Sequence, residues 1–175
     1  MTETRSLTVP DIRTKGRKLF GYAALFDTET RIGDAFTEVI RPGAFAATLR
    51  EREDILALMD HSPGKVIART KSGTLSLAED DTGLVFEVDV PDTQAGRDLL
   101  VMVERGDLGG MSFGFIAEDE KVEGERREIL AVELIEISFV SAFPAYEGTT
   151  LNARSGGAQI DHSLVRRIQI LELGG

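Results

Sequence analysis

Ser112 stands in the apolar segment 108–115, where glycines at positions 109, 110 and 114 surround it. Glycine weakens a strand, and it often marks a place where another backbone or a substrate approaches closely. A serine hydroxyl becomes an effective nucleophile only when a neighbouring base takes its proton. The same pattern also suits an ordinary small residue packed in a strand. Ser112 is therefore a candidate nucleophile that needs a base from elsewhere in the chain.

The candidate bases are the two histidines of the chain, His61 and His162. His61 follows the apolar run 55–59 within the turn-forming segment 60–64, so we expect it just past the end of a strand. Imidazole has an ordinary pKa of about 6.5, which suits a base at neutral pH, although an exposed turn histidine would have the same context. His162 lies among polar residues near the C-terminus, and we expect it to face solvent.

Glu136 is a carboxylate in the middle of the apolar run 134–140. A buried carboxylate needs a partner, and an imidazole N–H is a suitable one because the pair fixes the tautomer and orientation of the ring. Strand alternation would equally place Glu136 on a solvent-facing side, opposite Ile135 and Ile137. Glu133 is a weaker alternative for the same role, nearer the start of the strand.

Composition limits the function classes. A chain of 175 residues, 42% of them hydrophobic, is long enough for one core. The 20 Lys+Arg against 30 Asp+Glu give a net charge of −10, which argues against nucleic acid as a partner. The absence of cysteine excludes disulfides, a thiol nucleophile and thiolate zinc sites, and it suits an intracellular protein.

Targeting and cofactor motifs are missing from the sequence. Residues 1–18 are polar and no run approaches the length of a membrane span, so we expect a cytoplasmic protein without a membrane partner. We find no phosphate-binding loop, dinucleotide fingerprint or histidine pair at zinc-ligand spacing. The acidic runs 79–81 and 118–120 lack a full loop of alternating ligands, which favours solvated turns. We therefore expect no cofactor and no metal.

Hydrophobic periodicity predicts a mainly β protein with peripheral helices, of the α+β class. The strands are expected at 18–26, 36–40, 55–59, 73–77, 84–90, 109–117 and 128–140. A short helix is expected at 44–54 and a longer one at 93–105, the latter capped by Asp92. The charged segment 118–127 is expected to form a hairpin tip. A closed or nearly closed β-barrel fits this order of elements best.

The two ends of the chain differ in character from its centre. We expect residues 1–17 to be a flexible tail and residues 18–151 to form the domain. Residues 152–175 are expected to be a polar linker followed by an amphipathic segment, in which apolar residues recur at helical spacing. That segment could dock on the domain or on a partner.

The order of several motifs resembles the tailed-phage (caudoviral) prohead protease family, serine peptidases related to the herpesvirus maturational protease (assemblin). The likeness covers residues 19–151 and rests on Gly21-Tyr22-Ala23 with Phe26, Arg41-Pro42-Gly43-Ala44-Phe45, Asp60-His61, Gly106-Asp107, Ser112-Phe113-Gly114-Phe115, and 134–140 followed by Phe143-Pro144-Ala145. The resemblance implies an assemblin-like β-barrel. It also implies that Ser112 is the nucleophile, His61 the catalytic histidine and Glu136 the acid. Related viral enzymes use a second histidine as the third member, and the matching strand here has none.

The resemblance implies a capsid-maturation endopeptidase that works inside the immature procapsid (prohead) in the host cytoplasm. Its partners would be the major capsid protein and the scaffold protein, with a homodimer as a further implication. Self-cleavage would fall in the connector 152–157. Backbone amides near Ser112 and the Arg69 side chain are candidate oxyanion donors. Two alternatives stay open: a non-catalytic scaffold or capsid-binding barrel, and a hydrolase built on carboxylates such as Glu136 and Glu133.

Overall fold

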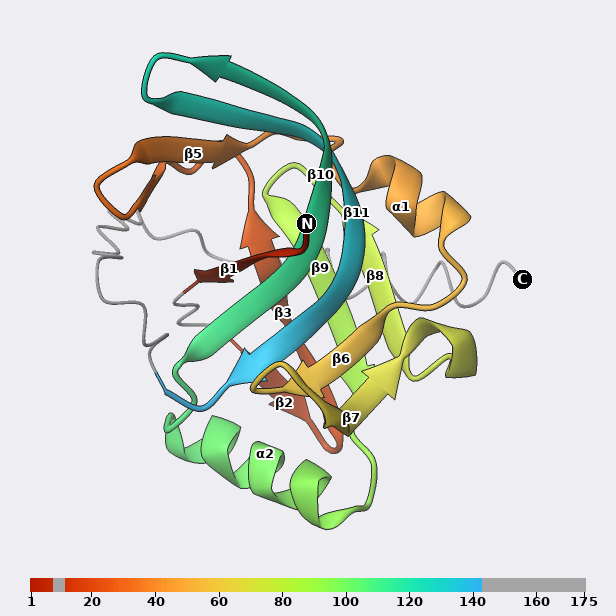
Figure 1. Cartoon of the computed structure of the whole chain (residues 1–175). Coiled ribbons are helices and arrows are strands. Elements are labelled where there is room, and N and C mark those ends of the chain that lie inside the picture. Colours follow the sequence, from red (N-terminus) through yellow and green to blue (C-terminus); the bar gives the residue numbers. More distant parts are fainter. Residues whose placement is uncertain (8–11, 143–175) are drawn as a thin grey trace.

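The computed structural model describes residues 1–7 and 12–142, which form two β-sheets with two α-helices (Figure 1). The strands are β1 (Glu3–Leu7), β2 (Arg13–Lys15), β3 (Lys18–Leu25), β4 (Thr30–Ile32), β5 (Phe36–Ile40), β6 (Leu56–Met59), β7 (Ser62–Arg69), β8 (Leu75–Glu79), β9 (Gly83–Asp89), β10 (Gly110–Glu123) and β11 (Arg126–Val140). The helices are α1 (Ala46–Glu51), α2 (Gln94–Arg105) and the 3-10 turn η1 (Thr70–Ser72). This part of the chain is therefore mostly β, with few helices, as the sequence predicts.

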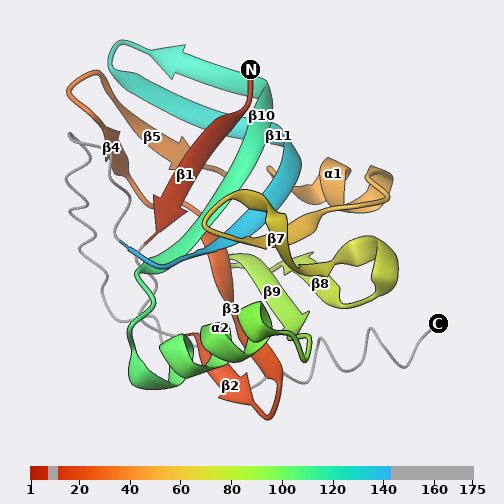
Figure 2. The same ribbon diagram turned by 60° about the horizontal axis from the view of Figure 1, so that its bottom comes forward.

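The larger sheet is organised around the long antiparallel pair of β10 and β11. β1 pairs with the outer side of β10 along its first half (Figures 1 and 2). β11 is long enough to have two parallel neighbours on its other side, β5 near its start and β6 near its end. β4 continues the sheet beyond β5, and β7 continues it beyond β6. The first half of β10 thus lies between an N-terminal strand and the end of β11 that carries β6.

The smaller sheet has the order β2-β3-β9-β8 and is antiparallel throughout. β8 and β9 form the hairpin that the sequence predicts around residues 79–83. The side chains that join the sheets are large and fully buried. Phe86 of β9 meets Phe139 of β11 edge-on, with ring centroids 5.6 Å apart. The core therefore lies between the smaller sheet and the β10–β11 pair.

The closed barrel that we expected is not supported, because the two sheets are open. β1, β4 and β7 end the larger sheet and β2 and β8 end the smaller one, and no strand pairing joins the sheets within residues 1–7 and 12–142. Alternation along a strand indicates which side chains are buried. It carries no information on whether the outermost strands of a sheet meet, and closure depends on that meeting.

Both predicted helices are present, but the cap of the longer one differs from expectation. Thr93, and not Asp92, precedes the first turn of α2, and its side chain accepts a hydrogen bond from the Gly96 N–H at 3.2 Å. Asp92 lies one residue too early and pairs with Arg17 and Arg97. A side-chain oxygen can reach the free N–H groups of the first turn only from the capping position itself.

The β10–β11 hairpin continues beyond the point where we expected its tip. The ladder continues into the predicted loop 118–127, and only residues 124–125 remain between the strands. Ion pairs across the strands, such as that of Arg127 with Glu120, join these charged segments. The charges that suggested a loop are instead strand side chains, many of them exposed.

The N-terminal residues differ most from the expected flexible tail 1–17. Glu3–Leu7 forms β1 on the edge of β10, and Arg13–Lys15 forms β2 on the edge of β3. The predicted linker and amphipathic segment, with His162, lie outside the described residues. Within the described ranges, no helix is long and apolar enough to cross a membrane.

Candidate active site

The tip of the β6–β7 hairpin carries His61. The hairpin loop consists of Asp60 and His61, and both have positive φ, 50° and 54°. Positive φ at both central residues is the pattern of a type I′ turn, which glycine and asparagine adopt most easily. The Asp60 carboxylate accepts hydrogen bonds from Ser141 N at 2.8 Å and from Ser141 Oγ at 2.7 Å. These bonds hold the strained tip against the end of β11.

His61 is held by two residues of β11. Its backbone N–H donates to Ser138 Oγ at 3.2 Å, and its Nδ1 lies 2.7 Å from Glu136 Oε1. Ser138 Oγ in turn donates to Glu136 Oε2 at 2.6 Å. An ionised carboxylate only accepts, so Nδ1 carries the proton and Nε2 is left as an acceptor. The buried Glu136 thus has a partner on each oxygen, and the ring has one tautomer.

The Glu136 carboxylate also sets the charge preference of the ring. Its hydrogen bond raises the pKa of His61 above the ordinary value, against the opposing effect of partial burial. A proton taken up by this imidazole is therefore stabilised by the adjacent negative charge. The pair combines a neutral acceptor nitrogen with a stabilised protonated form, which a general base requires.

Gly114 leaves the space in which the carboxylate lies. In the β10–β11 ladder Gly114 is opposite Glu136, and Ser112 is opposite Ser138. A Cβ at position 114 would lie 2.7 Å from Glu136 Oε1. The glycine two residues after the serine is therefore required by the acid on the next strand, and not by a turn.

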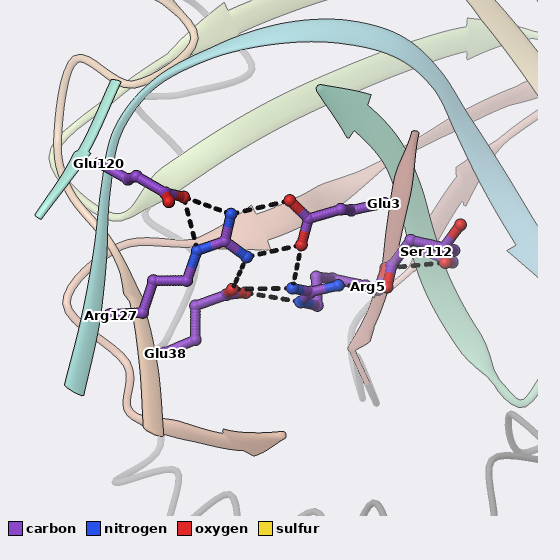
Figure 3. Close-up of polar contacts among 7 residues, drawn as sticks. Glu3, Arg5, Glu38, Ser112, Glu120 and Arg127 are labelled. Atoms are coloured by element: carbon purple, nitrogen blue, oxygen red, sulfur yellow. Dashed lines mark hydrogen bonds and ion pairs between the residues drawn. The ribbon is translucent and has the colours of Figure 1, made fainter. Parts of the chain in front are cut away.

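Ser112 lies on β10, one strand away from the residue that holds His61. It is fully buried, and its Oγ donates a 2.7 Å hydrogen bond to the Arg5 carbonyl oxygen. Ser6 Oγ donates to Ser112 Oγ at 3.0 Å. Both of these hydrogen bonds join Ser112 to β1, and within the described residues Ser112 makes no hydrogen bond to His61. Figure 3 shows the contact between Ser112 and Arg5.

Of the predicted site residues, His61 and Glu136 are in contact, Ser112 lies opposite Ser138 on the neighbouring strand, and two others lie elsewhere. Glu136, and not Glu133, is the acid on His61, because the Glu133 side chain binds Arg52. Arg69 is separated from β11 by β6, and its guanidinium binds Asp54. The structure therefore gives no support to Arg69 as an oxyanion donor.

Ser138, Arg5 and Ser6 are the site neighbours that sequence reasoning missed. Ser138 could have been found, because a residue two positions after Glu136 lies on the same face of the strand. Arg5 and Ser6 carry no comparable signal. They lie in a strand of only five residues within a polar N-terminal stretch, and so short a pattern does not indicate which strand it pairs with.

A serine on β10, a carboxylate on β11 and a histidine in the β6–β7 turn form the side-chain set of a serine hydrolase. Comparison with protein families agrees with this class: residues 4–163 match the model of the caudovirus prohead serine proteases, and the chain belongs to that family. Searches of curated proteins and of solved structures give no match. The family is one of serine peptidases of the phage prohead, whose role is capsid maturation.

Proposed function

We propose that this chain is a capsid-maturation endopeptidase in which Ser112 is the nucleophile, His61 the general base and Glu136 the orienting acid. The contact between His61 Nδ1 and Glu136 Oε1, at 2.7 Å, is the observation that carries the proposal. Ser138 supports it, because this residue binds both members of the pair and lies opposite Ser112 in the ladder.

The proposed reaction follows from these positions. Ser112 Oγ attacks the carbonyl carbon of a peptide while His61 Nε2 takes the hydroxyl proton. The C–N bond then breaks, and the imidazolium returns the proton to the leaving amine. Glu136 balances the transient positive charge, and water hydrolyses the acyl-enzyme by the same route. Backbone amides near Ser112 are the proposed oxyanion donors, a contribution of about 3 kcal/mol for each donor in serine proteases.

β1 must move before this reaction begins. The single proton of Ser112 Oγ is donated to the Arg5 carbonyl, so it cannot at the same time be donated to His61. Release of β1 would free both the hydroxyl and the edge of β10. The proposed active state therefore differs from the described one in the position of residues 3–7.

The proposed substrates are the scaffold protein and the scaffolding segment of the major capsid protein, inside the prohead in the host cell. We also propose a homodimer, self-cleavage in the connector 152–157, and a relationship to the herpesvirus maturational protease. The C-terminal boundary of the protease domain is proposed at residue 151. Those viral enzymes use a second histidine as the third catalytic member. Glu136 is buried and bonded to His61, which supports it in that role here.

Co-expression with the capsid and scaffold proteins of the same phage tests the proposal. Wild type is expected to shorten these proteins, Ser112→Ala is expected to abolish cleavage, and Ser72→Ala, an exposed serine on η1, is expected to leave it intact. Cleavage that persists in Ser112→Ala would exclude the serine mechanism. A wild type that co-purifies with capsid protein without cleaving it would favour the non-catalytic alternative.

A further inference from the structure

β1 presents one particular peptide group to Ser112. It pairs antiparallel with β10, so that Glu3–Leu7 lies along residues 111–115. Within this strand it is the carbonyl oxygen of Arg5 that accepts the hydrogen bond from Ser112 Oγ, at 2.7 Å. Strand addition at a sheet edge is a common way for proteins to bind an extended peptide. β1 is thus an extended strand on the edge of β10 with one carbonyl group bonded to the serine.

The Arg5 side chain binds an acidic site on the face of the sheet opposite to Ser112 (Figure 3). Its Nε and one terminal nitrogen bind the two oxygens of Glu38 at 2.6 and 2.8 Å, which is a bidentate pair. Glu38 is only 3% exposed. The guanidinium carbon lies 5.4 Å from the centre of the Phe115 ring. A buried carboxylate beside an aromatic face selects a planar cation, and arginine fits this better than lysine.

Glu38 keeps a second cation that does not belong to β1. Its Oε2, which accepts from Arg5, also accepts from Arg127 at 3.0 Å. Arg127 further binds Glu3 and Glu120. When β1 leaves, Glu38 therefore retains a structural partner but loses its bidentate one. A buried carboxylate left partly unpaired favours the entry of another cation.

We propose that the edge of β10 is the substrate cleft, and that Glu38 and Phe115 select arginine as the residue whose carbonyl carbon Ser112 attacks. The substrate adds as a strand in place of β1, and the bond that breaks corresponds to the one between Arg5 and Ser6. This inference rests on the proposed role of Ser112 as nucleophile. Loss of a buried charge partner typically weakens binding at least 30-fold, so we expect a preference of about 100-fold for arginine over an uncharged residue.

The first test maps cleavage sites on a peptide library with the full-length protein. The library is made from an unrelated proteome with a glutamate-specific protease, so that arginine stays inside the peptides, and Ser112→Ala is the blank. Arginine is expected immediately before most bonds whose cleavage depends on Ser112, with lysine a distant second. Cleavage that depends on Ser112 but shows no arginine enrichment overturns this inference and leaves the proposed function intact. If no peptide is cleaved although co-expressed capsid protein is cleaved through Ser112, this inference is overturned and the proposed function stands. The absence of cleavage in both assays overturns both.

The second test changes the pocket and compares two matched peptides, one with arginine and one with glutamine before the cleaved bond. Glu38→Gln is expected to lower kcat/KM for the arginine peptide about 100-fold and to leave the glutamine peptide nearly unchanged. Phe115→Leu is expected to lower the arginine preference about threefold, the usual size of a cation–π contact. Glu128→Gln is the control, because Glu128 also pairs with two arginines, Arg41 and Arg126.

An unchanged arginine preference in a folded Glu38→Gln protein means that the Arg5–Glu38 pair only anchors β1, and it overturns the inference. Should Glu38→Gln fail to fold because Arg127 loses a partner, Phe115→Leu decides in the same way. A preference equal to that of wild type in Phe115→Leu then contradicts the proposed pocket, and a reduced one supports it.

Discussion

Glu136 Oε1 lies where Gly114 has no side chain, 2.7 Å from the position that a Cβ would take. The same oxygen binds Nδ1 of His61 at 2.7 Å. The missing side chain on one strand thus gives the acid of the next strand room to reach the histidine. Gly114 therefore contributes to the proposed chemistry by leaving space for the Glu136 carboxylate, and not by making the backbone flexible.

Gly114→Ala is expected to reduce proteolysis by at least tenfold while changing the free energy of unfolding by less than about 1 kcal/mol. The new methyl group meets the end of a flexible side chain, so the fold can adapt by moving the carboxylate, but the bond to His61 is then lost. Capsid-protein cleavage and urea unfolding are the measurements. Gly64→Ala is the control, because its nearest neighbour would be Ser62 Oγ at 4.0 Å. Full activity in Gly114→Ala would contradict this account.

Activity is expected to rise with pH through a midpoint above about 6.5, the ordinary value for histidine. The hydrogen bond to Glu136 raises the pKa of His61, and only the neutral ring accepts a proton from Ser112. Glu136→Gln should move the midpoint down and lower the maximal rate. NMR titration of a His162→Gln protein, in which His61 is the single histidine, gives the same pKa directly. A midpoint at or below the ordinary value would contradict the pair.

The same pKa shift predicts how stability depends on pH. A histidine whose pKa is raised by folding stabilises the protein fully below its unfolded pKa, about 6.5. That contribution is lost as the pH rises through the folded pKa. The free energy of unfolding should therefore fall over this interval in wild type and change less in Glu136→Gln. An equal slope in the two proteins would argue against stabilisation of the imidazolium by Glu136.

Arg5→Glu is expected to speed the labelling of Ser112 by a fluorophosphonate at least tenfold. The change places a carboxylate beside the buried Glu38, and the repulsion releases β1 from the serine. Arg5→Lys keeps the positive charge and should label much more slowly. Mass spectrometry of the intact protein follows the reaction. Equal rates in wild type and Arg5→Glu would mean that β1 does not restrict access to Ser112.

Thr93→Ala is expected to lower the free energy of unfolding by about 1 kcal/mol, because α2 loses its capping hydrogen bond to Gly96 N–H. Asp92→Ala removes only exposed ion pairs and should change it by less than about 0.5 kcal/mol. Urea unfolding of the two variants compares them directly. The reverse order of effects would support the cap that the sequence had suggested.

Several features of this protein follow from local sequence alone. Alternating apolar residues predict the hairpin of β8 and β9, and turn-forming residues place His61 at the end of a strand. The acid within an apolar run indicates that Glu136 needs a buried partner. Each of these depends on neighbours within a few residues, because side-chain direction in a strand repeats every second position.

Only the tertiary structure decides which strands meet. Ser112 and Arg5 are 107 residues apart, and Glu38 lies 33 residues from Arg5, yet Arg5 contacts both. For the same reason the sheets are open where a barrel was predicted, and the predicted tail contains two strands, β1 and β2. Strand pairing depends on which edges become neighbours when the core forms, and periodicity along the chain contains no record of that choice.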